Sequence, residues 1–439
     1  MFSVVGSNIL AWITAIRLKQ KYPKEEVTLI NFGPNMGGNS RSFEFKNQFI
    51  DYGMQTYYET GIQWADDIVK DSLGLMEIKY NKFEWPNHDI SKSFQNGRVS
   101  NSIFPEINIG NWSIEKLKDE LTKSNNEFSL KDYQDDLEMY YKERYGNLIW
   151  EKIKKIAEKF TNSESLDNLS QISLAPLPLD RINVPEVSDF QLLQEPSLWN
   201  LIAFKESSNI PKKLYKNVST IYPTEGGIYS LILALHSFAS SLGIKIILNA
   251  KEEIINLKKS SLQIEGKKEQ KVFWCIPNKL FQQSLETDLG IKPKPFNGSF
   301  VAFAYDGGTL SKNLHYLLSY EDDPIFRITF YRGLVGERSK EFGSIELLSS
   351  VDEYDEIFLI KRLEEMGVID DKNKISFSEI KFSPWPITFQ QGYKYQCKQV
   401  EDEIKSKFKN VILMNSNPIN SSIMQTPTLT HRLQSEILK

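Results

Sequence analysis

The first thirty or so residues contain a strand–turn–helix–strand pattern, which restricts the fold of this chain more than any other feature of the sequence. The apolar run Phe2–Val5 is rich in β-branched residues and predicts a buried strand. A helical pattern follows over Ile9–Lys21, with isoleucines four and then three positions apart, and Pro23 ends it. Val27–Ile30 predicts a second buried strand. Together these segments predict a βαβ unit with a right-handed crossover.

The turn after the first strand is where a dinucleotide-binding unit carries the fingerprint GxGxxG. The three glycine positions hold Gly6, Asn8 and Ala11, and Ser7 lies between the first two. Gly6 can form the tight turn, and Ala11 is an accepted small residue where the helix meets the strand. Asn8 departs from the fingerprint, because its side chain leaves less room for a pyrophosphate to approach the backbone. The turn itself remains possible, since asparagine tolerates a positive φ. Asn31 replaces the acid expected after the second strand, and its amide can still bond a ribose hydroxyl, more weakly.

The segment that follows the βαβ unit strengthens the prediction of a dinucleotide site. It contains Gly37, Gly38 and Arg41, and Asp51-Tyr52-Gly53 comes shortly afterwards. In this order the chain resembles the flavoprotein superfamily that includes monoamine oxidases, protoporphyrinogen oxidase, phytoene desaturases and UDP-galactopyranose mutase. The resemblance implies that the two glycines let backbone amides approach the pyrophosphate of FAD. It also implies that Arg41 faces a phosphate or the isoalloxazine edge.

A second glycine pair, Gly226-Gly227, precedes a helical pattern that Gly243 ends, and a strand pattern follows over residues 244–248. The superfamily shows the same order, and the resemblance places Gly226 and Gly227 close to the flavin. The alternative is a Gly-Gly turn at the start of any helix. In the next predicted strand, Cys275 has the apolar neighbours of a buried core thiol.

A further cofactor position lies near the C-terminus, after the predicted strand at residues 410–414. The superfamily has a Gly-Asp pair there, whereas this chain has Asn415 and Ser416. The resemblance assigns these two residues to the ribityl chain of FAD. Neither Cys275 nor Cys397 lies in a loop suited to a covalent flavin link, so non-covalent binding is expected.

The catalytic residues that we predict lie on an alternating strand over residues 326–332. Period 2 places Arg327, Thr329 and Tyr331 on one face, opposite an apolar face. In mutases the resembling arginine approaches the flavin or the substrate phosphates, so Arg327 and Tyr331 are assigned to the substrate site. The alternative for Arg327 is an exposed sheet arginine paired with a neighbouring acid.

The predicted fold class is α/β: a Rossmann-like FAD/NAD(P)-binding domain with an inserted α+β substrate domain. The nucleotide domain is expected to be discontinuous, with residues 1–60, 215–295 and 385–439. The substrate domain would comprise residues 61–214 and 296–384, as a helical layer and an antiparallel sheet. In that layer the charges of Lys152, Lys154, Lys155 and Lys159 are expected to be solvated among glutamates.

Composition excludes several other classes of function. The 439 residues include 53 basic and 57 acidic side chains, for a net charge of -4, so no nucleic-acid partner is expected. With two cysteines and four scattered histidines, neither a disulfide framework nor a metal site is expected, and a cytoplasmic location is favoured. No apolar run reaches the roughly 20 residues of a membrane-spanning helix.

These observations predict an FAD-dependent oxidoreductase of the amine oxidase/protoporphyrinogen oxidase-like superfamily that acts on a small molecule. One alternative is a flavin-dependent nucleotide-sugar mutase that resembles UDP-galactopyranose mutase. The other is a binding protein of the same fold that has lost its cofactor, because Asn8, Asn31 and the pair Asn415-Ser416 all depart from the superfamily pattern. The sequence leaves the substrate and the oligomeric state open.

Overall fold

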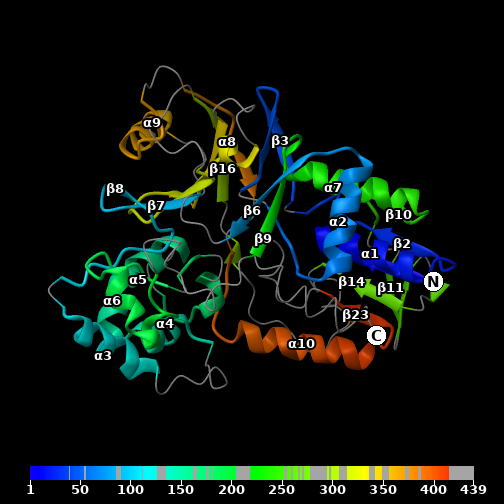
Figure 1. The fold of residues 1–439 in the computed structure, drawn as a ribbon. Coiled ribbons are helices and arrows are strands. Elements are labelled where there is room, and N and C mark those ends of the chain that lie inside the picture. The colour runs from blue at the N-terminus through cyan, green and yellow to red at the C-terminus, as the bar shows by residue number, and fades with distance from the viewer. Residues whose placement is uncertain are drawn as a thin grey trace. The chain divides into compact units, whose positions relative to one another are not determined.

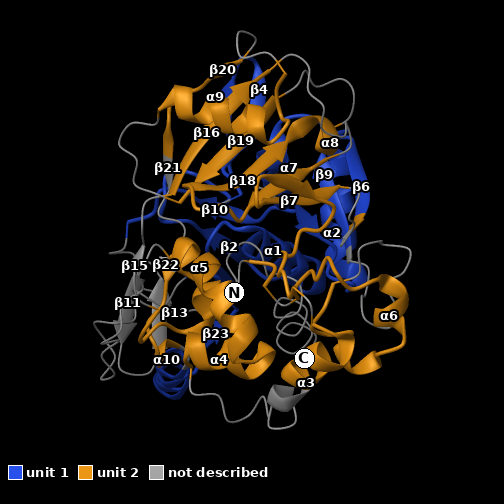
Figure 2. Cartoon of the chain, turned by 90° about the vertical axis from the view of Figure 1, so that its left-hand side faces the viewer, with its two compact units in different colours: residues 1–83, 219–290, 395–439 blue, residues 84–218, 291–394 orange. Residues whose placement is uncertain are grey.

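The computed structural model describes twenty-one stretches of the chain. These are residues 1–38, 40–53, 56–85, 90–110, 112–125, 135–161, 166–174, 177–179, 181–203, 218–251, 255–258, 261–264, 267–268, 271–276, 294–295, 298–305, 314–335, 342–348, 355–370, 375–383 and 387–414. The chain forms two compact units, and each is assembled from separate segments (Figure 2). Unit 1 comprises residues 1–83, 219–290 and 395–439, and unit 2 comprises residues 84–218 and 291–394.

The central sheet of unit 1 has five strands in the order β10-β2-β1-β14-β23, and every neighbouring pair is parallel (Figure 1). The strands are β1 (Phe2–Val5), β2 (Val27–Ile30), β10 (Lys245–Ile247), β14 (Lys271–Trp274) and β23 (Val411–Leu413). All residues of β1 and β2 are buried, as in a parallel sheet with both faces covered. Both strands have the bounds expected from the sequence, and the Rossmann-like α/β fold is confirmed.

Four helices accompany this sheet in unit 1. They are α1 (Ile9–Lys21), α2 (Gln63–Leu75), α7 (Gly227–Ser241) and α10 (Tyr393–Lys407), the last of which begins two residues before the unit boundary. On one face of the sheet, α10 contributes Val400 and Ile404 to a core with Trp274 and Leu413. Helix α2 contacts α1 and α7, and the first segment of unit 1 extends to residue 83.

Shorter strands complete the described part of unit 1. Strands β3 (Ser42–Phe45) and β4 (Gln48–Asp51) form a hairpin in which Ser42 lies opposite Asp51. Strands β5 (Tyr57–Tyr58), β9 (Val218–Pro223) and β6 (Tyr80–Trp85) form a second sheet, and β11 (Ile255–Lys258), β12 (Ser261–Ile264) and β13 (Lys267–Lys268) a third.

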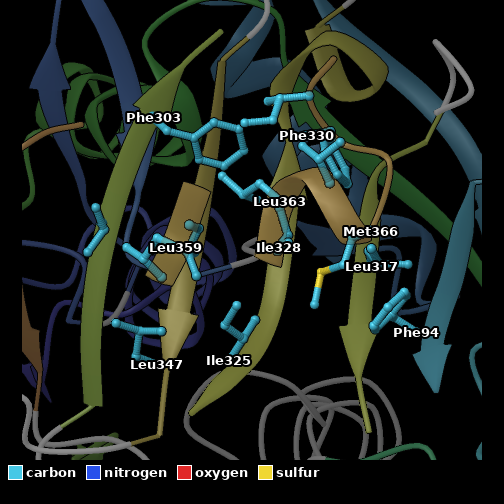
Figure 3. Close-up of a cluster of buried hydrophobic side chains, with 14 of the residues drawn as sticks. Phe94, Phe303, Leu317, Ile325, Ile328, Phe330, Leu347, Leu359, Leu363 and Met366 are labelled. Carbon is cyan, nitrogen blue, oxygen red and sulfur yellow. The ribbon is translucent and has the colours of Figure 1, made fainter. Parts of the chain in front are cut away.

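Unit 2 is built on an eight-stranded sheet with the order β20-β16-β19-β18-β17-β7-β8, and β21 also pairs with β16. Its strands are β7 (Ser91–Gln95), β8 (Arg98–Ser100), β16 (Gly298–Ala304), β17 (Tyr316–Ser319), β18 (Ile325–Phe330), β19 (Phe342–Leu347), β20 (Ser376–Phe377) and β21 (Lys381–Ser383). One face packs against α9 (Glu356–Glu365), whose Leu359 and Leu363 meet Phe303 and Ile328 in the core (Figure 3). A separate pair joins β15 (Lys294–Pro295) to β22 (Ile387–Thr388).

Unit 2 also contains several helices. They include α3 (Ile114–Asn125), α4 (Leu137–Tyr145), α5 (Asn147–Thr161), α6 (Asp189–Leu193) and the 3-10 helices η1 (Gln171–Leu174) and η2 (Pro196–Leu198). The expectation of a strand through residue 332 is wrong, because β18 ends at Phe330 and Tyr331 begins α8 (Tyr331–Val335).

Lys159 on α5 is a second correction, because its charge is not solvated. The Lys159 side chain is 8% exposed, and its Nζ donates hydrogen bonds to the carbonyl oxygens of Ser319, Glu321 and Ile325 at 2.7–2.8 Å. The connection between β17 and β18 therefore encloses the ammonium group. None of the helices described is both long and apolar enough to cross a membrane.

Candidate functional site

The turn between β1 and α1 is organised by Asn8. The Gly6 N–H donates to the carbonyl of Ile30 at 2.8 Å, and Asn8 then caps the helix, since its Oδ1 accepts from the N–H of Ala11 at 2.9 Å. Its Nδ2 donates to the carbonyl of Cys275 at 2.9 Å. Asn8 has a φ of -72°, so the left-handed backbone allowed for it in the sequence is not used. The side chain is folded back on the protein, and Ala11 is fully buried.

The loop after β2 is organised by Asn31, which is buried. Its Nδ2 donates to the carbonyl oxygens of Gly33 and Asn35 at 2.6 and 3.1 Å, and its Oδ1 accepts from the hydroxyl of Ser7 at 2.9 Å. Both amide protons are therefore used within the loop. The expected contact with a ribose hydroxyl could involve only the remaining lone pair of Oδ1.

Gly37 joins this loop to the first turn. Its N–H lies 2.9 Å from the carbonyl oxygen and 3.2 Å from the Oγ of Ser7. Gly37 has a φ of +91°, and an added Cβ would lie 2.7 Å from the carbonyl oxygen of Ser40, so this position requires glycine. Gly38 is exposed, with open space where a Cβ would project. The two glycine segments of the sequence thus meet at the start of α1.

Arg41 follows this loop and carries a guanidinium group that lacks a hydrogen-bond partner at one buried atom. Its Cζ lies 5.3 Å from the centre of the Tyr52 ring, a cation–π contact, and its buried Nε has no acceptor among the described residues. Among the described residues no carboxylate pairs with Arg41. Asn39, in the same loop, lies outside the described residues.

Asp51 links the hairpin to α7, a role that the sequence analysis missed. It is 1% exposed, and its carboxyl group accepts from the hydroxyls of Ser42 and Tyr222 and, at 3.0 Å, from the N–H of Ile228. Burial raises the pKa of Asp51 to about 7, against the opposing effect of these hydrogen bonds. The sequence feature that could have indicated this role is an acidic residue directly after the apolar residue Ile50 in a strand.

The second glycine pair begins α7 beside this carboxyl group. Gly227 has a φ of +62°, and an added Cβ would lie 2.5 Å from both the Oδ1 of Asp51 and the Oγ of Ser42. Gly226 immediately precedes the helix. One turn further along α7, Ile232 contacts Gly37, because a Cβ at Gly37 would lie 3.0 Å from its Cγ1. The described structure therefore connects Gly226-Gly227 to the first glycine loop within unit 1.

The remaining predicted residues lie elsewhere. Asn415 and Ser416 fall outside the described residues. Arg327 lies in β18 of unit 2, where its Nε and Nη2 donate to the two carboxylate oxygens of Glu346 on β19 at 2.6 and 3.0 Å. Tyr331 is buried at the start of α8. Both faces of β18 are buried, so the alternative of an exposed sheet arginine is wrong as to exposure, whereas its pairing with a neighbouring acid is confirmed.

The described groups around the start of α1 form an environment suited to an anion. The N–H groups of Ile9 and Leu10 have no acceptor among the described residues, and the positive end of the helix dipole lies here. A phosphate could accept from such N–H groups. Within the described residues, no group of three or more His, Cys, Asp or Glu side chains is placed to hold a metal ion. The Cys275 thiol is buried, and burial raises its pKa, so it is a core residue as expected.

The sheet order, the crossover helix and the first turn define a Rossmann-like dinucleotide-binding fold. Residues 4–71 match the family model of the NAD(P)-binding Rossmann-like domain. None of the curated proteins compared with the sequence matches it.

Solved structures share the fold over nearly the whole chain. A candidate protoporphyrinogen oxidase from Exiguobacterium sp. 255-15 is 14% identical, with a TM-score of 0.59, and the match covers 99% of this chain and 98% of that one. Reduced UDP-galactopyranose mutase is 13% identical, with a TM-score of 0.63 and coverage of 99% and 93%. A double mutant of putrescine oxidase is 11% identical, with a TM-score of 0.55 and coverage of 100% and 98%. The resemblance seen in the sequence is thus confirmed at the level of the fold.

Proposed function

We propose that unit 1 binds FAD non-covalently and that the protein is an FAD-dependent oxidoreductase of the amine oxidase/protoporphyrinogen oxidase-like superfamily, acting on a small molecule. The observation that carries the proposal is the contact of Gly37 with Ser7, 2.9 Å from N–H to carbonyl oxygen. This hydrogen bond brings the loop after β2 onto the turn before α1. The glycine segments at Gly6 and Gly37 lie farther apart in the sequence than the glycines of a GxGxxG fingerprint. Both nevertheless lie at the N-terminus of α1.

The residues present fit a dinucleotide in three respects. Gly38 leaves open space beside its backbone, the first two N–H groups of α1 have no described acceptor, and the buried Nε of Arg41 has no partner in the described part of the chain. The Oδ1 of Asn8, the residue that departs from the fingerprint, accepts from the N–H of Ala11. This N–H group is therefore not available to a phosphate. The bound flavin would supply the redox chemistry. In this proposal the chain supplies hydrogen-bond donors for the phosphates and a positive charge at Arg41.

Reconstitution tests the proposal directly. Purified protein incubated with excess FAD should show flavin absorbance that remains after desalting, and denaturation should release FAD unmodified. Ligand at 100 times its dissociation constant should add about 2.7 kcal/mol to the free energy of unfolding. The matched control is NAD, which shares the adenosine diphosphate moiety but lacks the flavin. Absence of both absorbance and a melting-temperature shift with FAD would reject the assignment and favour a binding protein that has lost its cofactor.

A nucleotide-sugar mutase remains the second candidate, and the likeness to reduced UDP-galactopyranose mutase favours it at the level of the fold alone. The bidentate contact of Arg327 with Glu346 occupies two of its donor atoms, which weakens the case for this arginine as a phosphate ligand. Turnover of UDP-galactopyranose after dithionite reduction, and not before it, would identify a mutase. Reoxidation of the flavin by oxygen or a quinone during turnover would identify an oxidoreductase.

A further inference from the structure

The carboxyl group of Asp51 is held by donors from three different elements of unit 1. Ser42 belongs to β3, Tyr222 to β9 and Ile228 to α7, and the Tyr222 hydroxyl lies 2.6 Å from Oδ2. Asp51 itself ends β4. One buried side chain thus joins the hairpin, the second sheet and the helix that begins at the second glycine pair.

Ser42 links Asp51 to a second backbone N–H group at the start of α7. The Oγ of Ser42 accepts from the N–H of Tyr229 at 3.2 Å and donates to the carboxyl group of Asp51. The N–H groups of Ile228 and Tyr229 are therefore both occupied by the β3–β4 hairpin. Consequently the start of α7 is capped from outside the helix, and the hairpin cannot move without breaking this cap.

Arg41 is attached to the same hairpin end. It directly precedes Ser42, its carbonyl accepts from the N–H of Tyr52 at 3.1 Å, and its guanidinium lies over the Tyr52 ring. Tyr52 in turn directly follows Asp51. Arg41 is next to Ser42 of one strand, and Tyr52 is next to Asp51 of the other. The contact between Ser42 and Asp51 therefore holds together the two chain segments that position the arginine.

We propose that Asp51 is a positioning residue for dinucleotide binding, which acts by holding Arg41 in place through Ser42 and through the start of α7. This inference rests on the proposed function, since it assigns Arg41 to the cofactor phosphates. Asp51 itself does not touch the cofactor. Its effect on affinity passes through the guanidinium group, and so disappears when that group is removed.

A thermodynamic cycle on FAD affinity tests this coupling. The variants are Arg41→Ala, Asp51→Ala and the double variant, and affinity is measured by titrating apoprotein with FAD and following flavin fluorescence. Each single variant should weaken binding about tenfold, and the double variant should be no weaker than Arg41→Ala alone. Asp51→Asn should restore near-normal affinity at pH 8, because the amide oxygen still accepts from Ser42 and Ile228 and the amide nitrogen can donate to Tyr222.

Two further variants keep the test decisive if Asp51→Ala does not fold. Ser42→Ala replaces it in the same cycle, because that substitution removes the contact to Asp51 and leaves the carboxyl group in place. Ser72→Ala is the matched control, since Ser72 is a fully buried serine of α2 that bonds its own helix. The control should change melting temperature without changing FAD affinity.

The outcomes separate this inference from the proposed function. Losses that add in the double variant, or Ser42→Ala with unchanged affinity and a lowered melting temperature, would overturn it and leave Asp51 a residue of stability only. If the unmodified protein binds no FAD, the proposed function fails first and the positioning role falls with it. Binding by the unmodified protein with no loss in Arg41→Ala would refute the inference while leaving the proposed function intact.

Discussion

At the scale of single residues, two buried charged groups are stabilised in different ways. Asp51 has hydroxyl and backbone donors around it, and none of the partners described for its carboxyl group carries a positive charge. Arg327 has a carboxylate in bidentate contact on the neighbouring strand. Neutral donors offset only part of the desolvation of a carboxylate, whereas an ion pair offsets more of it but fails when one partner is removed. These two residues therefore respond differently to pH and to substitution.

Asp51 makes stability depend on pH. Its pKa is about 7 in the folded protein against 3.8 for an ordinary aspartate, so the folded state holds a proton between these values that the unfolded state releases. Stability from this group is therefore complete below about pH 4, falls as the pH rises through this window and levels off above pH 7. The difference of about 3 pKa units corresponds to about 4 kcal/mol.

Asp51→Asn should remove this dependence, because the amide resembles the protonated acid and cannot titrate. We expect the variant to match the unmodified protein near pH 4 and to exceed its free energy of unfolding by about 4 kcal/mol at pH 8. Urea denaturation across this pH range measures the difference. Asp71→Asn, on the exposed side of α2, is the control and should keep the normal profile. A variant that still loses stability between pH 4 and 7 would show that another group titrates.

Arg327→Lys tests whether that arginine serves the substrate or the fold. Lysine cannot bond both oxygens of Glu346, so a buried carboxylate would be left partly unpaired. We expect the free energy of unfolding to fall by about 3 kcal/mol, with FAD content unchanged. Replacing both partners, as Arg327→Met with Glu346→Leu, should recover most of the loss. A melting temperature that stays constant while turnover disappears would instead support the substrate role predicted from the sequence.

At the scale of elements, hydrogen bonds from the ammonium group of Lys159 hold α5 against the β17–β18 connection of unit 2. Lys159 donates to three carbonyl oxygens, and Asp323 lies between it and Arg362 of α9, at 3.5 Å from Nζ of Lys159. Phe160, the next residue, packs edge-on against Phe326 in β18. The helical layer and the sheet are thus joined by adjacent polar and aromatic contacts. The pKa of Lys159 is lowered to about 8 by burial.

Lys159→Met should destabilise unit 2, because the methionine fills the space while three carbonyl oxygens lose their donor. A loss of about 3 kcal/mol in the free energy of unfolding is expected, the usual magnitude for removing one partner of a buried charge cluster. Lys155→Met, exposed on the same helix, is the control and should change stability by less than about 0.5 kcal/mol. Equal stabilities of the two variants in urea would show that the ammonium group contributes little.

At the scale of the whole molecule, the chain passes between the two units four times, between residues 83 and 84, 218 and 219, 290 and 291, and 394 and 395. The five-stranded sheet of unit 1 shows why these returns are needed. Strands β1 and β2 come from the N-terminal segment, β10 and β14 from the middle and β23 from the C-terminal one. No contiguous fragment shorter than about the whole chain therefore contains this sheet. Folding of unit 1 requires contacts of high sequence separation, which form slowly.

Local pattern was sufficient for the βαβ unit, and it also accounts for the turn at Asn96-Gly97 that joins β7 to β8. The apolar runs Phe2–Val5 and Val27–Ile30 and the helix between them have the bounds that the sequence predicts, since periodicity and proline act over a few residues. Asn96 and Gly97 both have positive φ, as a two-residue hairpin turn requires. The glycine loops and Arg41 were also identified as candidates from their order along the chain.

Only the tertiary structure decided which atoms these residues use. Asn8 and Asn31, departures from a fingerprint in the sequence, are the cap of α1 and the organiser of the next loop. The solvated lysine proved to be enclosed by carbonyl groups, and Arg327 proved to be paired with an acid 19 residues away. The sequence noted Asp51 only as part of Asp51-Tyr52-Gly53, and its partners became known when the fold placed Tyr222 and Ile228 beside it. A strand or helix depends mainly on residues adjacent to it in the sequence, so the sequence determined these elements. The partner of a side chain depends on segments distant in the sequence, so only the tertiary structure decided it.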